Sequence, residues 1–261
     1  MKHIFVGGRN LALEFSELGL DVEYMSAEAF LAVSDTEEFR ESQLVFAYSR
    51  FLKQAFPESS PAIEMKPLLK KFHQLQARSK VVLSSVAVYG LREEEIGLSE
   101  EAECLGTSDY AKERLDVERF FGEQATGHSE KITLLRPSSL IYSRIKGRPN
   151  LISRLSEIKG GGSQRISIES NGEQIRDFCT TAMLAKVVEA NSERSLPKVL
   201  NVADVEAIKV KALVSGFLTE SQMSQVDYVK TQSPLIHCSL DKVLLKKHFS
   251  VEEKYVFDLL S

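Results

Sequence analysis

Three residues near the middle of the chain have types and spacing that suit proton transfer. Ser85 ends an apolar run, Tyr110 lies early in a helical pattern, and Arg114 follows Tyr110 by one turn on the same face. A tyrosine acts as an acid or base near neutral pH only where its phenolate is favoured, and a nearby permanent positive charge favours it. A serine hydroxyl can orient the substrate oxygen. The group predicts acid–base catalysis; the structural alternative is a core serine and a half-buried helix tyrosine.

The elements that would position these residues follow a βα repeat. Short apolar runs alternate with longer amphipathic runs, which is typical of a parallel sheet covered by helices. We expect strands at 4–6, 21–25, 44–47, 81–83, 132–135, 166–168 and 199–202. We expect helices at 11–18, 61–79, 108–123 and 181–190, and a helical region at the C-terminal end.

Four residues come just after expected strands: Gly7, Ala47, Ser85 and Pro137. In an open α/β sheet the ligand lies beyond the carboxyl ends of the strands. These four residues should therefore converge on one crevice.

The composition excludes several kinds of partner. The 261 residues carry a formal net charge of −4, which argues against a nucleic-acid backbone, because such binding depends on clustered Lys and Arg. The densest basic stretch, 66–80, is interpreted as the solvated face of a helix. No run approaches the ~20 apolar residues of a membrane span, and the apolar run at 4–6 is too short for a signal peptide. We expect a cytoplasmic protein that binds neither nucleic acid nor membrane.

The cysteines and histidines do not form a recognisable site. The three cysteines are far apart and odd in number, so we expect reduced thiols rather than zinc ligands or a redox motif. No two of the five histidines stand four residues apart, the spacing that places two metal ligands on one helix face. We therefore expect no metal.

The central residues also form two motifs in a fixed order. The run LSSVAVYG spans 83–90, and YAKERLDVE spans 110–118. They resemble the extended short-chain dehydrogenase/reductases, in which Ser-Ser-x-x-Val-Tyr-Gly precedes Tyr-x-x-x-Lys with a glutamate four residues on. The matching residues are Ser85, Tyr110 and Glu118. Arg114 stands where the lysine belongs, which keeps the charge but changes its reach and geometry.

The second half of the chain extends the resemblance. The run LLRPSS at 134–139 is similar to the family's Leu-Arg-Pro-x-Asn segment, and NGEQIRDF at 171–178 is similar to its Gly-x-x-x-Arg-Asp-Phe. By position, Arg176 would grip the diphosphate of a nucleotide sugar, and its planar fork suits phosphate oxygens; a surface salt bridge is the structural alternative. Ser139 replaces the family's substrate-binding asparagine, and Met183 stands where an aspartate is usual.

The resemblance implies a fold and an organisation. The fold would be α/β, a Rossmann-type doubly wound parallel sheet with a small C-terminal substrate-binding lobe. Residues 1–261 would form a single extended domain, in which 1–140 are mainly the dinucleotide-binding core. Residues 141–261 would be mainly the substrate lobe, with returns to the core. Family members commonly dimerise through two helices per subunit, one of which would carry Tyr110, so a homodimer is implied.

The first βα turn departs from the family. It should read Gly-x-x-Gly-x-x-Gly, which allows a tight turn and close approach of the backbone to the cofactor pyrophosphate. Only Gly7 remains of the three; Asn10 tolerates a left-handed backbone, whereas Leu13 is predicted to put a bulky side chain between helix and strand. The helix that ends at Gly19 is about a turn short. The interval to Ser85 is also short, so one strand–helix connection should be missing.

The resemblance implies NAD or NADP as the cofactor. Arg9 would bind a phosphate, such as the 2′-phosphate of NADP, or else be a solvated loop residue. Asp35 would contact the adenine or else be a simple turn residue, and Arg114 would hold the nicotinamide ribose. The expected cofactor contacts are Gly7, Arg9, Asn10, Asp35, Ala47, Arg114, Pro137 and Ser138.

Two functions remain open. The first is an NAD(P)-dependent epimerase or ketoreductase acting on a nucleotide-linked sugar, with Tyr110 as general acid/base and Ser85 orienting the substrate oxygen. Ser139 and Arg176 would bind the diphosphate, and dehydration is the least expected reaction because no acidic residue follows Ser85 directly. The second is a relative that binds a nucleotide, a nucleotide sugar or a protein partner without redox catalysis, which the altered glycine turn favours.

Overall fold

The chain folds into two compact units. The computed structural model describes residues 1–50, 63–90, 97–123, 132–142, 151–230, 237–252 and 254–260. Unit 1 comprises Met1–Gly90, Glu103–Pro137 and Thr181–Leu200, and unit 2 comprises Leu91–Ala102, Ser138–Thr180 and Asn201–Ser261.

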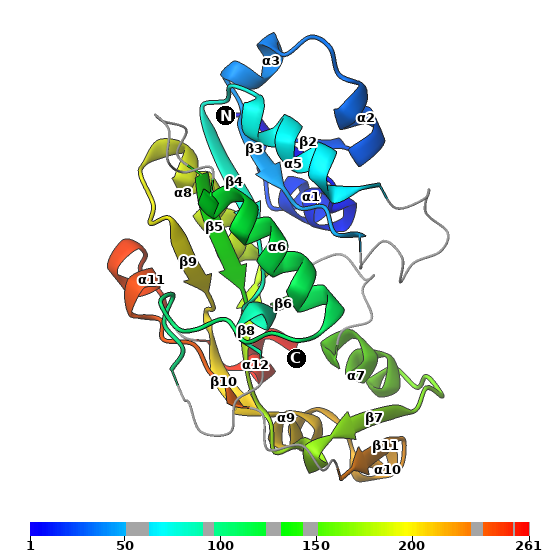
Figure 1. Ribbon diagram of the computed structural model, residues 1–261. Coiled ribbons are helices and arrows are strands. Elements are labelled where there is room, and N and C mark those ends of the chain that lie inside the picture. The colour runs from blue at the N-terminus through cyan, green and yellow to red at the C-terminus, as the bar shows by residue number, and fades with distance from the viewer. Residues whose placement is uncertain are drawn as a thin grey trace. The chain divides into compact units, whose positions relative to one another are not determined.

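Unit 1 is built on a six-stranded sheet. Its strands are β1 His3–Val6, β2 Val22–Met25, β3 Gln43–Phe46, β4 Ser79–Leu83, β5 Ile132–Pro137 and β9 Val199–Val202. Their order in space is β2-β1-β3-β4-β5-β9 (Figure 1), and the pairs β1–β2, β1–β3, β3–β4 and β4–β5 are parallel. The inner strands are buried almost throughout, which explains why their sequences are continuous apolar runs.

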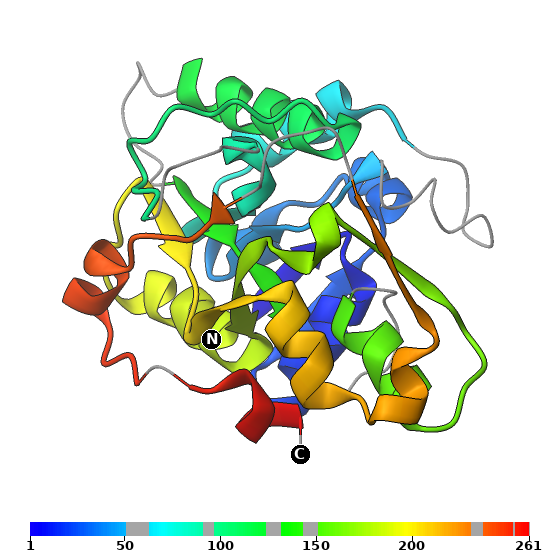
Figure 2. The same cartoon turned by 90° about the horizontal axis from the view of Figure 1, so that it is seen from below.

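Helices cover both faces of this sheet. They are α1 Arg9–Glu17, α2 Ala27–Ala32, α3 Glu37–Arg40, α5 Met65–Gln74, α6 Asp109–Glu123 and α8 Thr181–Glu193, with the 3₁₀ helix η1 at Val86–Tyr89. α5 packs beside α6, and α1 beside α8; Figure 2 shows the two pairs on opposite sides of the strands. This arrangement is a doubly wound, Rossmann-type sheet.

The strand order agrees with the missing strand–helix connection. The usual doubly wound sheet has two strands on the outer side of the first strand, whereas in the described part of this chain β2 alone lies there. The order reverses between β1 and β3. The carboxyl ends of these two strands, followed by Gly7 and Ala47, therefore form the switch point at which such sheets bind ligands.

An aromatic cluster fixes α5 and α6 on the sheet. The ring of Phe72 on α5 lies 5.3 Å from that of Phe46 on β3 and 5.9 Å from that of Phe121 on α6, centroid to centroid, in edge-on geometry. All three rings are buried, and edge-on pairs add ~0.5–1.5 kcal/mol each beyond burial. The cluster holds the helix that carries Tyr110 against the strands.

Unit 2 contains a four-stranded sheet, a two-stranded sheet and several short helices. Its strands are β6 Ser139–Ile141, β7 Ile166–Glu169, β8 Ile175–Thr180, β10 Val205–Lys209, β11 Val226–Val229 and β12 His237–Cys238. Its helices are α7 Leu151–Lys159, α9 Val210–Phe217, α10 Glu220–Met223, α11 Val243–His248 and α12 Val256–Leu260, with the 3₁₀ helix η3 at Ser170–Gly172. β8 pairs with β6, β10 and β12, and β7 pairs with β11.

The expected helix at 61–79 is too long. α5 spans Met65–Gln74, and residues 61 and 62 lie outside the described residues. After α5 the chain becomes extended, because the backbone N–H of Arg78 donates to the carbonyl of Ser42 and Ser79 begins β4. None of the described helices combines the length and the apolar character needed to cross a membrane.

Candidate functional site

Ser85 stands at the carboxyl end of β4 and begins η1. Its backbone is extended, and its Oγ accepts the N–H of Ala87 at 3.2 Å. This is the bond of an N-cap serine, which satisfies a donor that the helix itself leaves unpaired. The side chain is half-buried. Ser85 is therefore held at the strand end with part of its surface accessible.

Tyr110 lies in the first turn of α6, which packs against η1. Ser108 caps this helix by accepting the N–H of Ala111 at 3.1 Å. Gly106 draws the two elements together, because its N–H donates to the carbonyl of Val88 at 2.9 Å. A Cβ on Gly106 would lie 2.6 Å from the Ala111 Cβ, so no larger residue fits. The elements that carry Ser85 and Tyr110 are thus in direct contact.

A buried polar network supports both elements. Glu118 on α6 accepts two hydrogen bonds from Arg136 on β5, at 3.0 Å from Nε and 2.6 Å from Nη2. The hydroxyl of Ser84 also donates to Glu118. Arg136 Nη1 donates to the Tyr89 hydroxyl at 2.8 Å, and its guanidinium lies 4.9 Å from the Tyr89 ring centroid. The network links α6, β5 and both ends of the segment that contains Ser85.

The charges in this network are buried but paired. Glu118 and Arg136 are 9% and 5% exposed. Burial by itself lowers the pKa of Arg136, but the hydrogen bonds and negative charge of Glu118 outweigh that effect and raise it. A buried pair with this geometry is costly to break from one side, because the remaining charge loses its partner.

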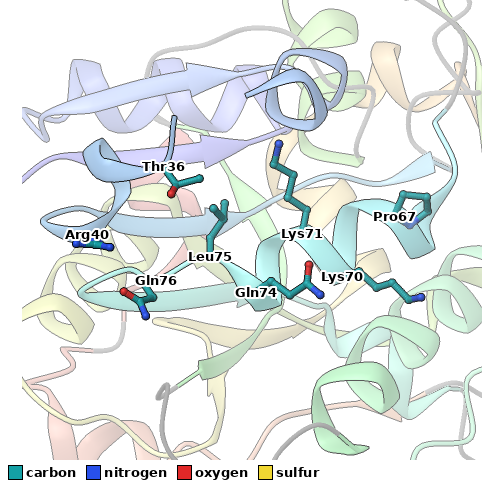
Figure 3. Close-up of a pocket in the computed structure, with 8 residues that line it drawn as sticks. All are labelled: Thr36, Arg40, Pro67, Lys70, Lys71, Gln74, Leu75 and Gln76. Atoms are coloured by element: carbon teal, nitrogen blue, oxygen red, sulfur yellow. The ribbon is translucent and has the colours of Figure 1, made fainter. Parts of the chain in front are cut away.

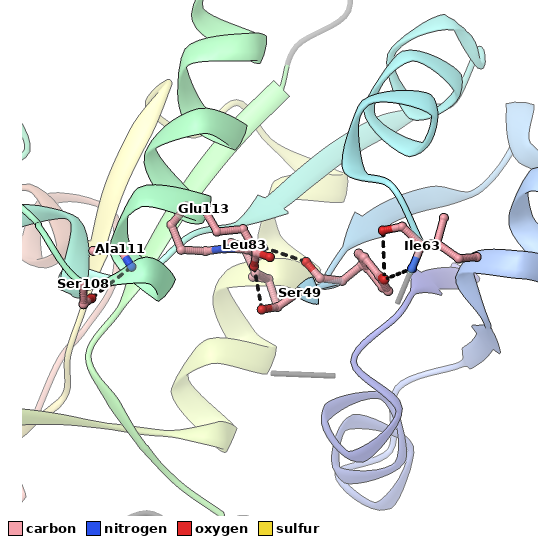
Figure 4. Close-up of polar contacts among 8 residues, drawn as sticks. Ser49, Ile63, Leu83, Ser108, Ala111 and Glu113 are labelled. Carbon is pink, nitrogen blue, oxygen red and sulfur yellow. Dashed lines mark hydrogen bonds and ion pairs between the residues drawn. The ribbon is translucent and has the colours of Figure 1, made fainter. Parts of the chain in front are cut away.

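Arg114 points into the protein. Its Nη1 donates to the carbonyl of Leu83 at 3.1 Å, and its Nη2 donates to the carbonyl of Tyr48 at 2.9 Å and to Glu113 Oε1 at 2.7 Å. Ser49 donates to the same carboxylate at 2.6 Å (Figure 4). The guanidinium also lies 5.8 Å from the Tyr110 ring centroid. Arg114 therefore lies against the Tyr110 ring, but it is surrounded by groups of the protein.

The first βα turn is tighter than its sequence indicated. Gly7 and Gly8 both have positive φ, at +76° and +65°, and a Cβ on Gly8 would lie 2.6 Å from the Cβ of Ala47. Both glycines are therefore required, and α1 begins directly afterwards at Arg9. The prediction that Leu13 obstructs helix–strand packing is wrong. α1 begins so soon that Leu13 faces solvent, 45% exposed.

The other expected cofactor residues of unit 1 lie around the strand ends. Arg9 is exposed. Burial raises the pKa of Tyr24, on β2, and the positive charge of Arg9 opposes that rise in part. Asn10 is half-buried in the first turn of α1. Asp35 is exposed and accepts the N–H of Glu37, ahead of α3.

The two expected substrate residues meet in unit 2. Ser139 on β6 and Arg176 on β8 both line a cavity of about 450 Å³. Its other polar lining residues are Arg154, Ser167, Glu169 and Gln174, and its apolar lining residues are Leu140, Leu151, Ile152, Ile166, Ile168, Phe178 and Val210. Arg176 donates to Gln174 Oε1 at 3.1 Å. The cavity combines two guanidinium groups with an apolar lining.

Pro137 and Ser138 follow one another at the point where β5 ends. Pro137 is the last residue of β5. Ser138 begins the next segment of unit 2, where its N–H donates to the carbonyl of Val202 at 3.0 Å. Its Oγ is buried and has no hydrogen-bond partner in the described structure. A buried hydroxyl of this kind is satisfied in most proteins, so it is a candidate ligand contact.

The sequence did not single out Arg154 or Glu113. Arg154 lies on α7, whose buried face, Ile152, Leu155 and Ile158, has helical spacing that could have located the helix. Nothing in the sequence distinguishes Glu113 from other helix carboxylates. Among the described residues no group of three or more His, Cys, Asp or Glu side chains could hold a metal ion.

A second cavity, of about 600 Å³, lies in unit 1, but its charged side chains do not converge on one point (Figure 3). Its lining includes Arg40, Lys70 and Lys71, from the segments that precede β3 and β4, so it lies at the amino ends of those strands. The Lys71 ammonium already donates to the carbonyls of Leu31 and Val33. Figure 3 shows the three basic side chains pointing apart.

No protein-family model and no curated protein sequence matches this chain, but solved structures do. TunA, an NAD-dependent NDP-hexosamine 5,6-dehydratase of tunicamycin biosynthesis, is 17% identical with a TM-score of 0.72, over 95% of this chain and 91% of TunA. A UDP-N-acetylglucosamine 4-epimerase from Methanobrevibacter ruminantium is 19% identical with a TM-score of 0.72, over 97% of this chain and 93% of the epimerase. A UDP-glucose 4-epimerase from Thermus thermophilus, in complex with NAD, is 16% identical with a TM-score of 0.71, over 100% of this chain and 97% of the epimerase. At these identities the fold is what is shared: the chain has the Rossmann-type fold of these dehydratase and epimerase structures.

Proposed function

We propose that this protein is an NAD(P)-dependent epimerase or ketoreductase that acts on a nucleotide-linked sugar. The observation that carries the proposal is the unit 2 cavity, into which the chain brings Ser139, Arg176 and Arg154. Guanidinium groups bind diphosphate oxygens in a bidentate manner, and the apolar lining suits a planar base or the face of a sugar ring. The volume falls within the ~300–1,000 Å³ of small-molecule sites.

The first turn of unit 1 fits a dinucleotide. Because only two residues, Gly7 and Gly8, separate β1 from α1, the N-terminus of α1 lies at the switch point of the sheet. The N–H groups of Arg9 and Asn10 lie in the first turn, where a helix supplies no acceptor, and such N–H groups bind phosphates. Gly7, Gly8 and Ala47 would line the turn. The dinucleotide, when bound, supplies the hydride acceptor or donor of the reaction.

Tyr110 and Ser85 supply the proton chemistry in this proposal. Both are half-buried and lie on elements in direct contact. Tyr110 would remove the proton from a sugar hydroxyl as it is oxidised, or return it on reduction, while the Ser85 hydroxyl donates a hydrogen bond to the same oxygen. General acid–base catalysis of this kind contributes ~10²–10⁴-fold to the rate.

The neighbours support the reaction class. TunA is described as NAD-dependent, the Thermus thermophilus epimerase holds NAD, and the Methanobrevibacter ruminantium epimerase is in complex with UDP-N-acetylmuramic acid.

Calorimetric titration of the purified protein with NAD⁺, NADP⁺ and UDP-glucose tests the proposal. Arg176→Ala should weaken UDP-glucose binding at least ~10-fold, about the loss of one charged hydrogen bond, and leave NAD(P)⁺ binding unchanged. Arg165→Ala is the matched control, because Arg165 is an exposed unit 2 arginine paired with Asp227 and outside the cavity. Equal effects of the two variants, or no nucleotide binding by the wild type, would refute the proposal.

A second candidate is a binding protein of the same fold without redox chemistry. The observation in its favour is that the Arg114 guanidinium is directed at Leu83, Tyr48 and Glu113 rather than at an open surface. In that case the protein would bind the dinucleotide and UDP-glucose, but neither Tyr110→Phe nor Ser85→Ala would change any property other than stability.

A further inference from the structure

Arg114 is too enclosed to contact a bound molecule. Its side chain is 3% exposed, whereas Ser85 and Tyr110 are each half-buried. A group that binds a ligand must present surface to it before the ligand arrives. Three of its five N–H groups, on Nη1 and Nη2, already donate to groups of the protein. At 3% exposure the guanidinium presents almost no surface to a ribose unless the protein around it moves.

The partners of Arg114 show what it does instead. Leu83 is the last residue of β4, two residues before Ser85, and Tyr48 follows β3. A planar guanidinium can donate in two directions at once, and here it spans the carboxyl ends of two neighbouring strands. A lysine ammonium is a point charge on a flexible stem and cannot reproduce this fork. The arginine therefore suits the bridging role.

Glu113 and Ser49 hold the guanidinium in this orientation. The Glu113 side chain is 11% exposed, and its Oε1 accepts from both Arg114 Nη2 and Ser49 Oγ. The negative charge compensates the buried cation, and Ser49 ties the carboxylate to the segment after β3. Figure 4 shows Glu113, on α6, close to Ser49 and Leu83 at the strand ends.

We propose that Arg114 is a positioning residue, not a cofactor ligand, and that Glu113 and Ser49 hold it in place. Its guanidinium donates to the carbonyl of Leu83, at the end of the strand that leads to Ser85, and lies against the Tyr110 ring, at 5.8 Å from the centroid. It thereby sets the distance between the two catalytic groups of the proposed function, on which the proposal rests.

The experiment compares Arg114→Lys, Arg114→Met and Glu113→Gln, with Lys112→Met as control because Lys112 is an exposed cation on the same helix. The measurements are the Kd of NAD⁺ and of NADP⁺, kcat and KM for UDP-sugar turnover at 20 °C, and Tm. A positioning role predicts a Kd within ~3-fold of wild type for all variants, with kcat reduced at least ~10-fold and KM unchanged in the two Arg114 variants. Misplacement of reacting groups by ~1 Å is enough for losses of this size. Glu113→Gln should reduce kcat in the same direction.

The Arg114→Lys variant distinguishes a positioning role from a cofactor-binding role. If Arg114 holds the ribose, Arg114→Lys retains cofactor affinity and activity while Arg114→Met raises Kd more than ~10-fold, and the proposal is overturned. A lower Tm with kcat unchanged in every variant also overturns it, since the role is then structural only. If the wild type binds neither NAD⁺ nor NADP⁺, the proposed function fails, and the positioning role fails with it because there is no reaction whose groups need positioning. A wild type that binds cofactor and turns over a UDP-sugar, with kcat unchanged in the Arg114 variants, overturns the positioning role alone.

Discussion

Glu118→Gln tests the buried network that supports the catalytic elements. The amide keeps the shape and one acceptor oxygen, but it removes the charge opposite Arg136, which is 5% exposed. Removing one partner of a buried pair costs ~3–5 kcal/mol. Because one hydrogen bond to Arg136 survives in the amide, we expect a loss near ~3 kcal/mol, or ~150-fold in the folding equilibrium.

Urea denaturation followed by circular dichroism measures this loss, and Tm should fall by ~6–12 °C. Asp116→Asn is the matched control, because Asp116 and its partner Arg119 lie on the same helix and are 68% and 64% exposed. Exposed pairs contribute ~0–1 kcal/mol, so the control should be nearly unchanged. Adding Arg136→Met to Glu118→Gln should restore part of the stability, since no unpaired charge remains. A Glu118→Gln protein within ~1 kcal/mol of wild type would show that the network is not a buried pair.

Three further predictions concern unit 1. Gly8→Ala should lower the free energy of unfolding, measured in urea, by at least ~2 kcal/mol, because it adds left-handed strain to a clash with Ala47. Gly122→Ala is the control: its Cβ meets open space, and it should raise the free energy of unfolding by ~0.5 kcal/mol. Equal effects of the two variants would contradict the tight turn. Burial lowers the pKa of His3 below 6.5, despite its hydrogen bond to Gln43, so the unfolded chain takes up the proton first and Tm should fall as the pH drops below ~6.5. His3→Leu should flatten that dependence, and an unchanged slope would count against it. Arg9→Ala should weaken NADP⁺ binding more than NAD⁺ binding if Arg9 contacts the 2′-phosphate, and a uniform loss would assign it to the pyrophosphate.

The central sheet could be predicted from the sequence because its determinants are local. Strands buried on both faces appear as continuous apolar runs, and the Ser108 cap and the Ser84-Ser85 strand end lie within the segments they define. The strand pattern also revealed the missing connection through the short interval before Ser85. These features depend on residues close together in the chain.

Sequence-based prediction failed where the environment of a side chain depends on the helix register or on residues distant in the chain. The expectation for Leu13 assumed the helix register of the usual three-glycine turn. With α1 beginning at Arg9, Ala12 takes the buried position, at 1% exposed, and Leu13 turns outward. The partners of Arg114 include two backbone carbonyls, which every residue possesses, so no spacing in the sequence could indicate them. The cavity of unit 2 depends on short strands paired over long intervals, which periodicity does not resolve.

The most direct measurement of the central claim is turnover of a panel of UDP- and dTDP-sugars with NAD⁺ or NADP⁺, followed by NMR and by absorbance of the reduced nicotinamide. Wild-type protein and Tyr110→Phe are compared at equal concentration, after confirming equal Tm. We expect epimerisation or redox conversion of at least one sugar, with Tyr110→Phe slower by ~10²-fold or more. Saturable binding of cofactor and nucleotide sugar without any conversion by the wild type, or equal rates in the two proteins, would contradict it.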